Sequence, residues 1–177
     1  LETNQGLQNV YQIASSSNRI EALFFGAVDM SAELRCKNDW EALLYARSRV
    51  VHAAASNELD VIDVPFLDLE DLKGMENEAH KAKKIGFTGK GSVHPKQIEI
   101  LNKVFTPTIE EYNNAKKIIN TFDKTTSGLL VYKGKLIEKP VLREMYKIIK
   151  TYEKVNTKNS WIENVQGLSR SHKSKNK

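Results

Sequence analysis

The chain has 177 residues, of which 40% are hydrophobic and 28% charged, as in an ordinary soluble globular domain with one core. No apolar run approaches the roughly 18 residues needed to cross a bilayer, so we predict no association with a membrane. The net charge of +5 belongs entirely to residues 150–177, because residues 1–149 hold twenty basic and twenty acidic side chains. Nucleic-acid-binding proteins place positive charge on a folded face, so we predict no nucleic-acid partner and a basic, disordered tail over residues 156–177.

The only cysteine, Cys36, cannot form a disulfide within the chain. A lone cysteine favours a reducing compartment, so we predict a cytoplasmic protein, with the mitochondrial matrix as the alternative. The sequence opens with Leu1 and Glu2, which we interpret as the end of a strand.

Helical and strand-like segments alternate after this opening. Apolar residues at helical spacing predict helices over 6–14 and 39–55, the second capped by Asp39. Two short apolar runs predict strands, 20–26 buried on both faces and 61–67 interrupted by Pro65. The remaining expected elements are a helix from Asp68, a short strand at 92–94 and a helix from Pro95. This alternation is typical of parallel strands joined by right-handed crossovers.

About four strand–helix units are present if Leu1-Glu2 is counted as a stub. A complete (β/α)₈ TIM barrel needs eight units and roughly 250 residues. Residues 1–107 are therefore either a small open sheet, with the stub at its edge, or the C-terminal half of a TIM barrel.

The pattern changes after residue 107, and we predict a helix–β-hairpin–helix appendix over residues 108–155. Thr108 and Glu111 form a capping-box signature at the start of a helix. The segment GLLVYKGKLIE, residues 128–138, has the two apolar runs and central Lys-Gly of a hairpin. Pro140 then suits the first turn of a further helix.

Two carboxylates follow the ends of consecutive predicted strands. Glu2 follows the stub, and Asp29 follows strand 20–26 in the string FFGAVDM. Neighbouring parallel strands lie about 4.8 Å apart, and α/β folds place their chemistry at the carboxyl ends of strands. Two carboxylates this close repel unless a cation or proton lies between them, and Mg²⁺ takes one or two carboxylates with waters. A solvated loop carboxylate and a helix-capping Asp explain the same residues, so both interpretations stay open on spacing alone.

Four segments together resemble one family: LETNQGLQNV, IEALFFGAVDM, LLYARSRVVHAAA and GFTGKGSVHPKQIEILNKVFTPT. From Leu1 to about residue 150 the chain resembles the citrate lyase β-subunit family of the HpcH/HpaI aldolase superfamily. The resemblance implies a (β/α)₈ barrel, usually trimeric or hexameric, in which Glu2 and Asp29 bind Mg²⁺. The family also uses an Arg from an earlier strand and N-terminal segments that contact coenzyme A (CoA), and this sequence contains neither.

The appendix has a counterpart in the CoA-lyase branch of the family. There, a segment like Gly-Lys-Met-Ile-Asp-x-Pro closes over the active site of a neighbouring subunit, and its Asp is implicated in proton transfer. This chain reads GKLIEKP, so Glu138 replaces that Asp and is the implied catalytic residue. A solvent-facing Glu before a helix is the alternative.

The resemblance implies a Mg²⁺-dependent carbon–carbon lyase that cleaves a 3-hydroxyacyl thioester by retro-Claisen or aldol-type chemistry. Candidate substrates are citramalyl-CoA, malyl-CoA or a citryl thioester, on CoA or on an acyl-carrier protein, and the full-length protein is expected to be a homotrimer or homohexamer. One alternative is a truncated or split, non-catalytic fragment that acts only with a partner chain supplying the N-terminal half. Another is a 2-oxo acid aldolase that does not use CoA.

Other polar residues are expected to be structural. His94 precedes Pro95, and a structural hydrogen bond is favoured over a place in the site. Arg47 and Arg49 lie on the predicted helix 39–55, Arg47 nearer its apolar face, and family likeness suggests packing and subunit contact. No cluster of His and Cys indicates zinc.

Overall fold

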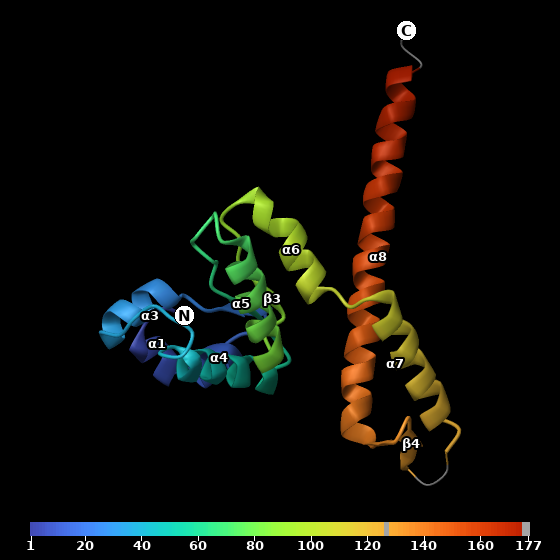
Figure 1. Cartoon of the computed structure of the whole chain (residues 1–177), viewed down its shortest axis with the longest axis horizontal. Helices are drawn as coiled ribbons and strands as arrows, with labels where there is room; N and C mark the ends of the chain where they lie inside the picture. The colour runs from blue at the N-terminus through green and yellow to red at the C-terminus, as the bar shows by residue number, and fades with distance from the viewer. Residues whose placement is uncertain (126–127, 175–177) are drawn as a thin grey trace. The chain divides into compact units, whose positions relative to one another are not determined.

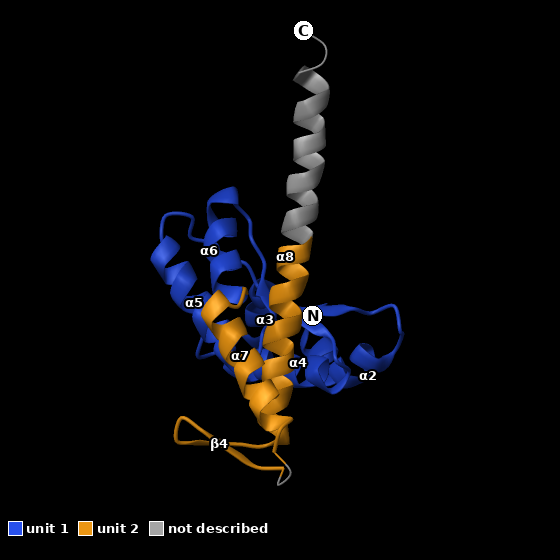
Figure 2. Cartoon of the chain, turned by 90° about the vertical axis from the view of Figure 1, so that its right-hand side faces the viewer, with its two compact units in different colours: residues 1–105 blue, residues 106–177 orange. Residues whose placement is uncertain are grey.

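The computed structural model of the chain describes residues 1–125 and 128–157 with their side chains. The chain divides into two compact units, Leu1–Phe105 and Thr106–Lys177, which Figure 2 colours blue and orange. Each unit has its own apolar core. No helix in the described part of the chain is both long and apolar enough to cross a membrane.

The first unit is a parallel α/β structure, as predicted (Figure 1). Its elements are α1 (Asn4–Gln8), α2 (Val10–Ser15), β1 (Ala22–Phe24), α3 (Ala27–Leu34), α4 (Leu44–Ser56), β2 (Asp60–Asp63), α5 (Leu72–Ile85), β3 (Gly89–Lys90) and α6 (Pro95–Phe105). The strands lie in the order β1-β2-β3, all parallel, with Phe24 beside Ile62 and Ile62 beside Gly89. Neighbours in sequence are thus neighbours in the sheet, which places the carboxyl ends of all three strands at one edge.

Leu1 extends this order by one position beside β1. Its terminal ammonium donates to the carbonyl of Phe24 at 2.7 Å, and its carbonyl accepts from the amide of Gly26 at 3.0 Å. A residue that bonds to positions j−1 and j+1 of its neighbour has the hydrogen-bond pattern of a parallel ladder. The expected stub therefore lies along the carboxyl end of β1.

Side chains of β1 and β2 alternate between a covered face and an open one. Leu23, Phe25 and Val61 are buried in the main core with side chains from α1, α2 and α4. Phe24, in contrast, is 46% exposed. The prediction that strand 20–26 is buried on both faces is therefore wrong, because the described residues cover only one face of this sheet.

Several element boundaries differ from the sequence-based expectation. The segment 6–14 is split into α1 and α2 at Asn9, and the short α3 was not predicted. Asp39 accepts a hydrogen bond from the amide of Ala42 at 2.9 Å, which shapes turns that precede α4 rather than capping it.

The later part of the first unit shows two further differences. Asp71, not Asp68, is the N-cap of α5, where its side chain accepts from the amide of Gly74. The third strand is Gly89–Lys90 instead of 92–94, because the Ser92 hydroxyl donates to the carbonyl of His94 and to the side-chain oxygen of Gln97 at the start of α6. Pro95 begins α6, as predicted.

The second unit contains α7 (Ile109–Phe122), β4 (Leu130–Tyr132), β5 (Lys135–Ile137) and α8 (Lys139–Ser174). The antiparallel hairpin β4-β5 and the predicted capping box are both present, with the Glu111 carboxylate accepting from the amide of Thr108 at 2.7 Å. Helices α7 and α8 pack together over a core that includes Ile119, Phe122 and Ile137. The tail predicted over residues 156–177 falls almost wholly outside the residues whose side chains are described, and it stays a prediction.

Candidate functional site

The backbone around Glu2 is fixed by contacts on both sides. Leu1 pairs with the end of β1, and Thr3 caps α1 by accepting from the amide of Gly6 at 3.0 Å. The carboxylate of Glu33, on α3, accepts from the amide of Asn4 at 2.5 Å. Glu2 is therefore held at the carboxyl edge of the sheet, between β1 and α3.

The side chain of Glu2 lies directly against Gly26. A β-carbon built on Gly26 would lie 2.3 Å from Cγ and 2.6 Å from Oε1 of Glu2, far inside van der Waals contact. Gly26 is the N-cap of α3, and Asp29 lies in the first turn of that helix. The structure thus places Glu2 against the N-cap of α3 and Asp29 in the first turn of the same helix, and a metal ion shared by the two carboxylates stays a prediction.

Neither carboxylate of this pair is engaged by the rest of the chain. Both residues are exposed, and neither side chain forms a hydrogen bond or ion pair with the described residues. Asp29 therefore does not cap α3 through a hydrogen bond, although an acidic group in a first turn interacts favourably with the helix dipole. Free carboxylate oxygens at a turn kept open by a glycine are a donor set that fits a hard divalent cation.

The pair offers no more than two protein ligands. No group of three or more His, Cys, Asp or Glu side chains that could hold a metal ion exists within residues 1–125 and 128–157. A zinc centre usually needs three or four such ligands. Mg²⁺ differs, because it retains several waters and is bound through one or two carboxylates.

Glu138 belongs to the second unit. It follows β5 directly, and its carbonyl accepts from the amide of Val141 at 2.9 Å, so its backbone begins α8. Its side chain is exposed. The carboxylate is thus presented to solvent at the junction of the hairpin and α8, and its proximity to Glu2 and Asp29 stays a prediction.

The residues expected to be structural have structural contacts. Nδ1 of His94 accepts from the amide of Lys96 at 3.1 Å, which helps to start α6. Arg49 donates to the carbonyls of Leu7 at 2.9 Å and Gln8 at 3.1 Å, at the end of α1. These contacts agree with the structural interpretation of both side chains.

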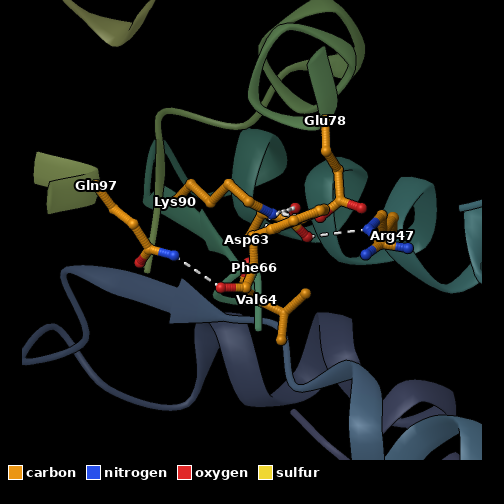
Figure 3. Close-up of polar contacts among 7 residues, drawn as sticks. All are labelled: Arg47, Asp63, Val64, Phe66, Glu78, Lys90 and Gln97. Atoms are coloured by element: carbon orange, nitrogen blue, oxygen red, sulfur yellow. Dashed lines mark hydrogen bonds and ion pairs between the residues drawn. The ribbon is translucent and has the colours of Figure 1, made fainter. Parts of the chain in front are cut away.

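A buried charged network at the carboxyl ends of β2 and β3 was not predicted (Figure 3). Asp63, which is fully buried, accepts from Nε of Arg47 at 2.9 Å and from Nζ of Lys90 at 2.8 Å. Lys90 also donates to the carboxylate of Glu78 at 2.6 Å and to the carbonyl of Val64 at 2.7 Å. An aspartate inside the apolar run VIDV was the signal in the sequence, since a strand facing a core rarely carries an unpaired charge.

The guanidinium of Arg47 is also enclosed by two aromatic rings. Its Cζ lies 5.2 Å from the ring centroid of Phe25 and 4.7 Å from that of Trp40. Arg47 is only 2% exposed, and its Nη1 has no hydrogen-bond partner among the described residues. The side chain is therefore oriented by one bond to Asp63 and by two aromatic faces.

Comparison with known proteins identifies the family. The family model described as HpcH/HpaI aldolase/citrate lyase matches residues 1–95, which is more than half of the chain. The matched region contains Glu2, Gly26, Asp29 and the whole charged network. The chain therefore belongs to the HpcH/HpaI aldolase/citrate lyase family, as the resemblance of its motifs indicated.

Individual relatives place the chain more closely within this family. It is 31% identical to citrate lyase subunit beta of Leuconostoc mesenteroides subsp. cremoris, over 85% of this chain and 51% of that protein. It is 30% identical to the mitochondrial citramalyl-CoA lyase of Rattus norvegicus, over 84% of this chain and 48% of that protein. The chain spans about half the length of these curated relatives.

A solved structure shows the same fold. The citrate lyase beta subunit from M. tuberculosis, complexed with oxaloacetate and magnesium, is 26% identical to this chain. The TM-score is 0.55, and the match covers 60% of this chain and 51% of that one. The parallel α/β arrangement of the first unit is therefore an arrangement that the family uses.

Proposed function

We propose that this chain carries the metal-binding part of a Mg²⁺-dependent carbon–carbon lyase that acts on a 3-hydroxyacyl thioester. One observation carries the proposal: Glu2 lies against Gly26, the N-cap of α3, Asp29 lies in the first turn of that helix, and both carboxylates are free of partners among the described residues. Membership of the family gives this pair its chemical meaning. The M. tuberculosis relative was crystallised with magnesium and oxaloacetate, a metal and a 2-oxo acid that suit such a lyase.

Glu2 and Asp29 are the proposed metal ligands. When bound, Mg²⁺ supplies a Lewis acid and a template for the oxygens of the 2-oxo acid product. Glu2 contributes a carboxylate whose direction is set by the open side of Gly26, and Asp29 contributes a second from the first turn of α3. Their two negative charges compensate one divalent cation, which removes the repulsion between them.

Glu138 is proposed to perform one of the two proton transfers that cleavage requires. A base removes the proton from the 3-hydroxyl group, the carbon–carbon bond breaks, and the hydroxyl carbon becomes the carbonyl of the 2-oxo acid. The electron pair of the broken bond stays with the thioester fragment, whose carbon is then protonated. The exposed carboxylate of Glu138 is free to act in either step on a neighbouring copy of the chain.

The surrounding architecture is proposed to be the C-terminal half of a (β/α)₈ barrel over residues 1–107, followed by the helix–hairpin–helix appendix over 108–155. The sequential parallel order of Leu1, β1, β2 and β3 supports this arrangement. The substrate candidates remain citramalyl-CoA, malyl-CoA and a citryl thioester, and the relatives named for citrate and citramalyl-CoA support this class. A homotrimer or homohexamer would provide the neighbouring copy that Glu138 needs.

A second candidate is a non-catalytic fragment that acts only when a partner supplies the N-terminal half of the barrel. The exposure of Phe24 on the uncovered face of the sheet favours this candidate. An apolar face of this kind is normally covered in a folded assembly. The two candidates differ in whether the purified chain cleaves thioesters without a partner.

The test measures metal binding and lysis on the same preparations. The wild type, Glu2→Gln and Asp29→Asn are titrated with Mn²⁺, followed by electron paramagnetic resonance, and are assayed with the three thioesters in the presence of Mg²⁺. We expect each substitution to weaken Mn²⁺ binding at least tenfold and to abolish lysis, because electrostatic stabilisation dominates such reactions. Near-normal binding and turnover in either variant would remove the metal assignment.

The control is Glu33→Gln, which neutralises a neighbouring carboxylate that already accepts from the amide of Asn4. A neutral side-chain oxygen still accepts that bond, so the site should keep its shape. If binding reflects only the general negative charge of this region, Glu33→Gln will weaken it as much as Glu2→Gln. Mn²⁺ binding without lysis by the isolated chain would favour the second candidate.

A further inference from the structure

The charged network is connected to the turn that holds the carboxylate pair. Arg47 bonds to Asp63 on β2 and lies against Phe25, the residue that follows β1 and precedes Gly26. The amide of Phe25 donates to the carbonyl of Ile62 at 2.9 Å, and the amide of Gly26 donates to Leu1. One path of direct contacts therefore runs from Asp63 through Arg47 and Phe25 to Gly26, which lies against Glu2 and begins the helix that carries Asp29.

The contribution of this network to stability does not by itself explain its presence. Buried ion pairs often contribute no more than apolar side chains of similar volume, because desolvation offsets their attraction. Here the guanidinium uses Nε for Asp63 while Nη1 has no partner in the described part of the chain, which adds an uncompensated cost. A planar guanidinium bonded through Nε and lying over two aromatic rings has, however, a well-defined orientation.

We propose that Arg47 is a positioning residue that holds Phe25, and through it the Gly26 turn, in the geometry that Glu2 and Asp29 need to bind a divalent cation together. This inference rests on the proposed function, since it assigns Arg47 a role toward the same metal. Asp63 orients Arg47 through Nε, and the guanidinium carbon lies 4.7 Å from the centroid of the Trp40 ring. The two cations, Arg47 and Lys90, are balanced by the two anions, Asp63 and Glu78, so the network carries no net charge (Figure 3).

The test compares Mn²⁺ affinity with thermal stability in a double-mutant cycle. Arg47→Met keeps an unbranched apolar side chain against Phe25 and Trp40, and Phe25→Leu removes the ring from the other partner. We expect each to weaken Mn²⁺ binding by about tenfold, the lower end of the range for residues that orient metal ligands. Because both act on one path, the double variant should weaken binding about as much as one single variant.

Met75→Ala is the matched control. Met75 is fully buried in a core cluster between α5 and α6 that is separate from the cluster containing Phe25. Large-to-small substitutions of this kind lower stability substantially, so the control shows what destabilisation alone does to binding. We expect its Mn²⁺ affinity to stay within twofold of the wild type although its melting temperature falls.

The outcomes separate this inference from the proposed function. Loss of binding in Glu2→Gln together with unchanged binding in Arg47→Met overturns the inference and leaves the metal site standing. Additive effects in the double variant, or a loss in Met75→Ala equal to that in Arg47→Met, also overturn it. A wild-type chain without a Mn²⁺ site at Glu2 and Asp29 overturns both. If Arg47→Met does not fold, Trp40→Leu takes its place in the cycle, with the same criteria.

Discussion

Glu2 and Gly26 are packed so closely that a single β-carbon on Gly26 would lie 2.3 Å from Cγ of Glu2. The backbone of Gly26 has φ −107° and ψ 113°, a conformation that any residue adopts. The position therefore requires glycine for space and not for conformational freedom. The position of the Glu2 side chain depends on the absence of a side chain at Gly26.

We predict that Gly26→Ala weakens Mn²⁺ binding at least about tenfold, because the new methyl group pushes the carboxylate of Glu2 out of position. The Mn²⁺ titration by electron paramagnetic resonance measures the effect. Gly74→Ala is the control, since its β-carbon would lie 2.0 Å from Oδ2 of Asp71 and disturbs a helix N-cap on α5 instead. It should lower stability by about 1 kcal/mol and leave Mn²⁺ binding unchanged. Equal affinities in Gly26→Ala and the wild type would contradict the role of this turn.

The buried aspartate of the network provides a second prediction, on stability. Asp63→Ala leaves the cations of Arg47 and Lys90 in the core without their shared partner. Removing one member of a buried ion pair typically costs about 3–5 kcal/mol, so we expect a loss of this size in urea denaturation of the first unit. Asp60→Ala, at the exposed start of the same strand, should change stability by no more than about 0.5 kcal/mol. A loss below about 1 kcal/mol for Asp63→Ala would mean that water reaches the network.

The positions of Glu2 and Asp29 near the end of β1 could be predicted because strand ends are visible in sequence. Apolar runs locate β1 approximately, and parallel order places the residues after consecutive strands at one edge. This rule, together with the glycine at position 26, accounts for the packing of Glu2 on Gly26. The nearby amides of Asn4 and Gly6, however, donate to the side chains of Glu33 and Thr3 and not to Glu2 or Asp29. Sequence patterns do not show which side chain accepts from these amides.

The charged network was harder to predict because its members come from four separate elements. Helical periodicity places Arg47 near the buried face of α4, but nothing local identifies Asp63 as its partner. That pairing depends on sheet register, which sets Asp63 beside Lys90 on a strand of two residues. So short a strand leaves no periodic pattern, and the glycines around Lys90 indicate a turn instead. The register between β2 and β3 therefore determines the pairing of the charged network, which sequence patterns do not show.

Glu138 provides a third prediction, which separates catalysis from metal binding. Glu138→Gln removes a titratable group but no proposed ligand, so Mn²⁺ affinity should stay unchanged while kcat for lysis falls by roughly 10²–10⁴-fold, the usual contribution of a general acid or base. Glu138→Asp keeps the carboxylate one methylene shorter and should retain part of the activity. The loss in Glu138→Gln should remain smaller than the loss in Glu2→Gln. A variant Glu138→Gln that loses Mn²⁺ binding would indicate that this residue is a ligand.

The last prediction concerns Lys116 at the contact between α7 and α8. Its ammonium donates to the hydroxyl of Tyr112 at 3.2 Å, and that hydrogen bond, together with the charge that Tyr112 carries when ionised, raises the pKa of Lys116 above its usual 10.5. A group whose pKa is raised by folding stabilises the folded state below its unfolded pKa, and this contribution disappears as the pH rises through the folded value. We therefore expect the contact to be fully formed at neutral pH and to weaken only above about pH 10.5.

Titration of the lysine Cε signals by NMR should show Lys116 among the last lysines to lose its proton. Tyr112→Phe keeps the ring that stacks on Tyr152 at 4.4 Å but removes the acceptor, so the pKa of Lys116 should fall toward its ordinary value. An unchanged titration in Tyr112→Phe would show that Glu153, whose carboxylate also raises this pKa, is the main partner.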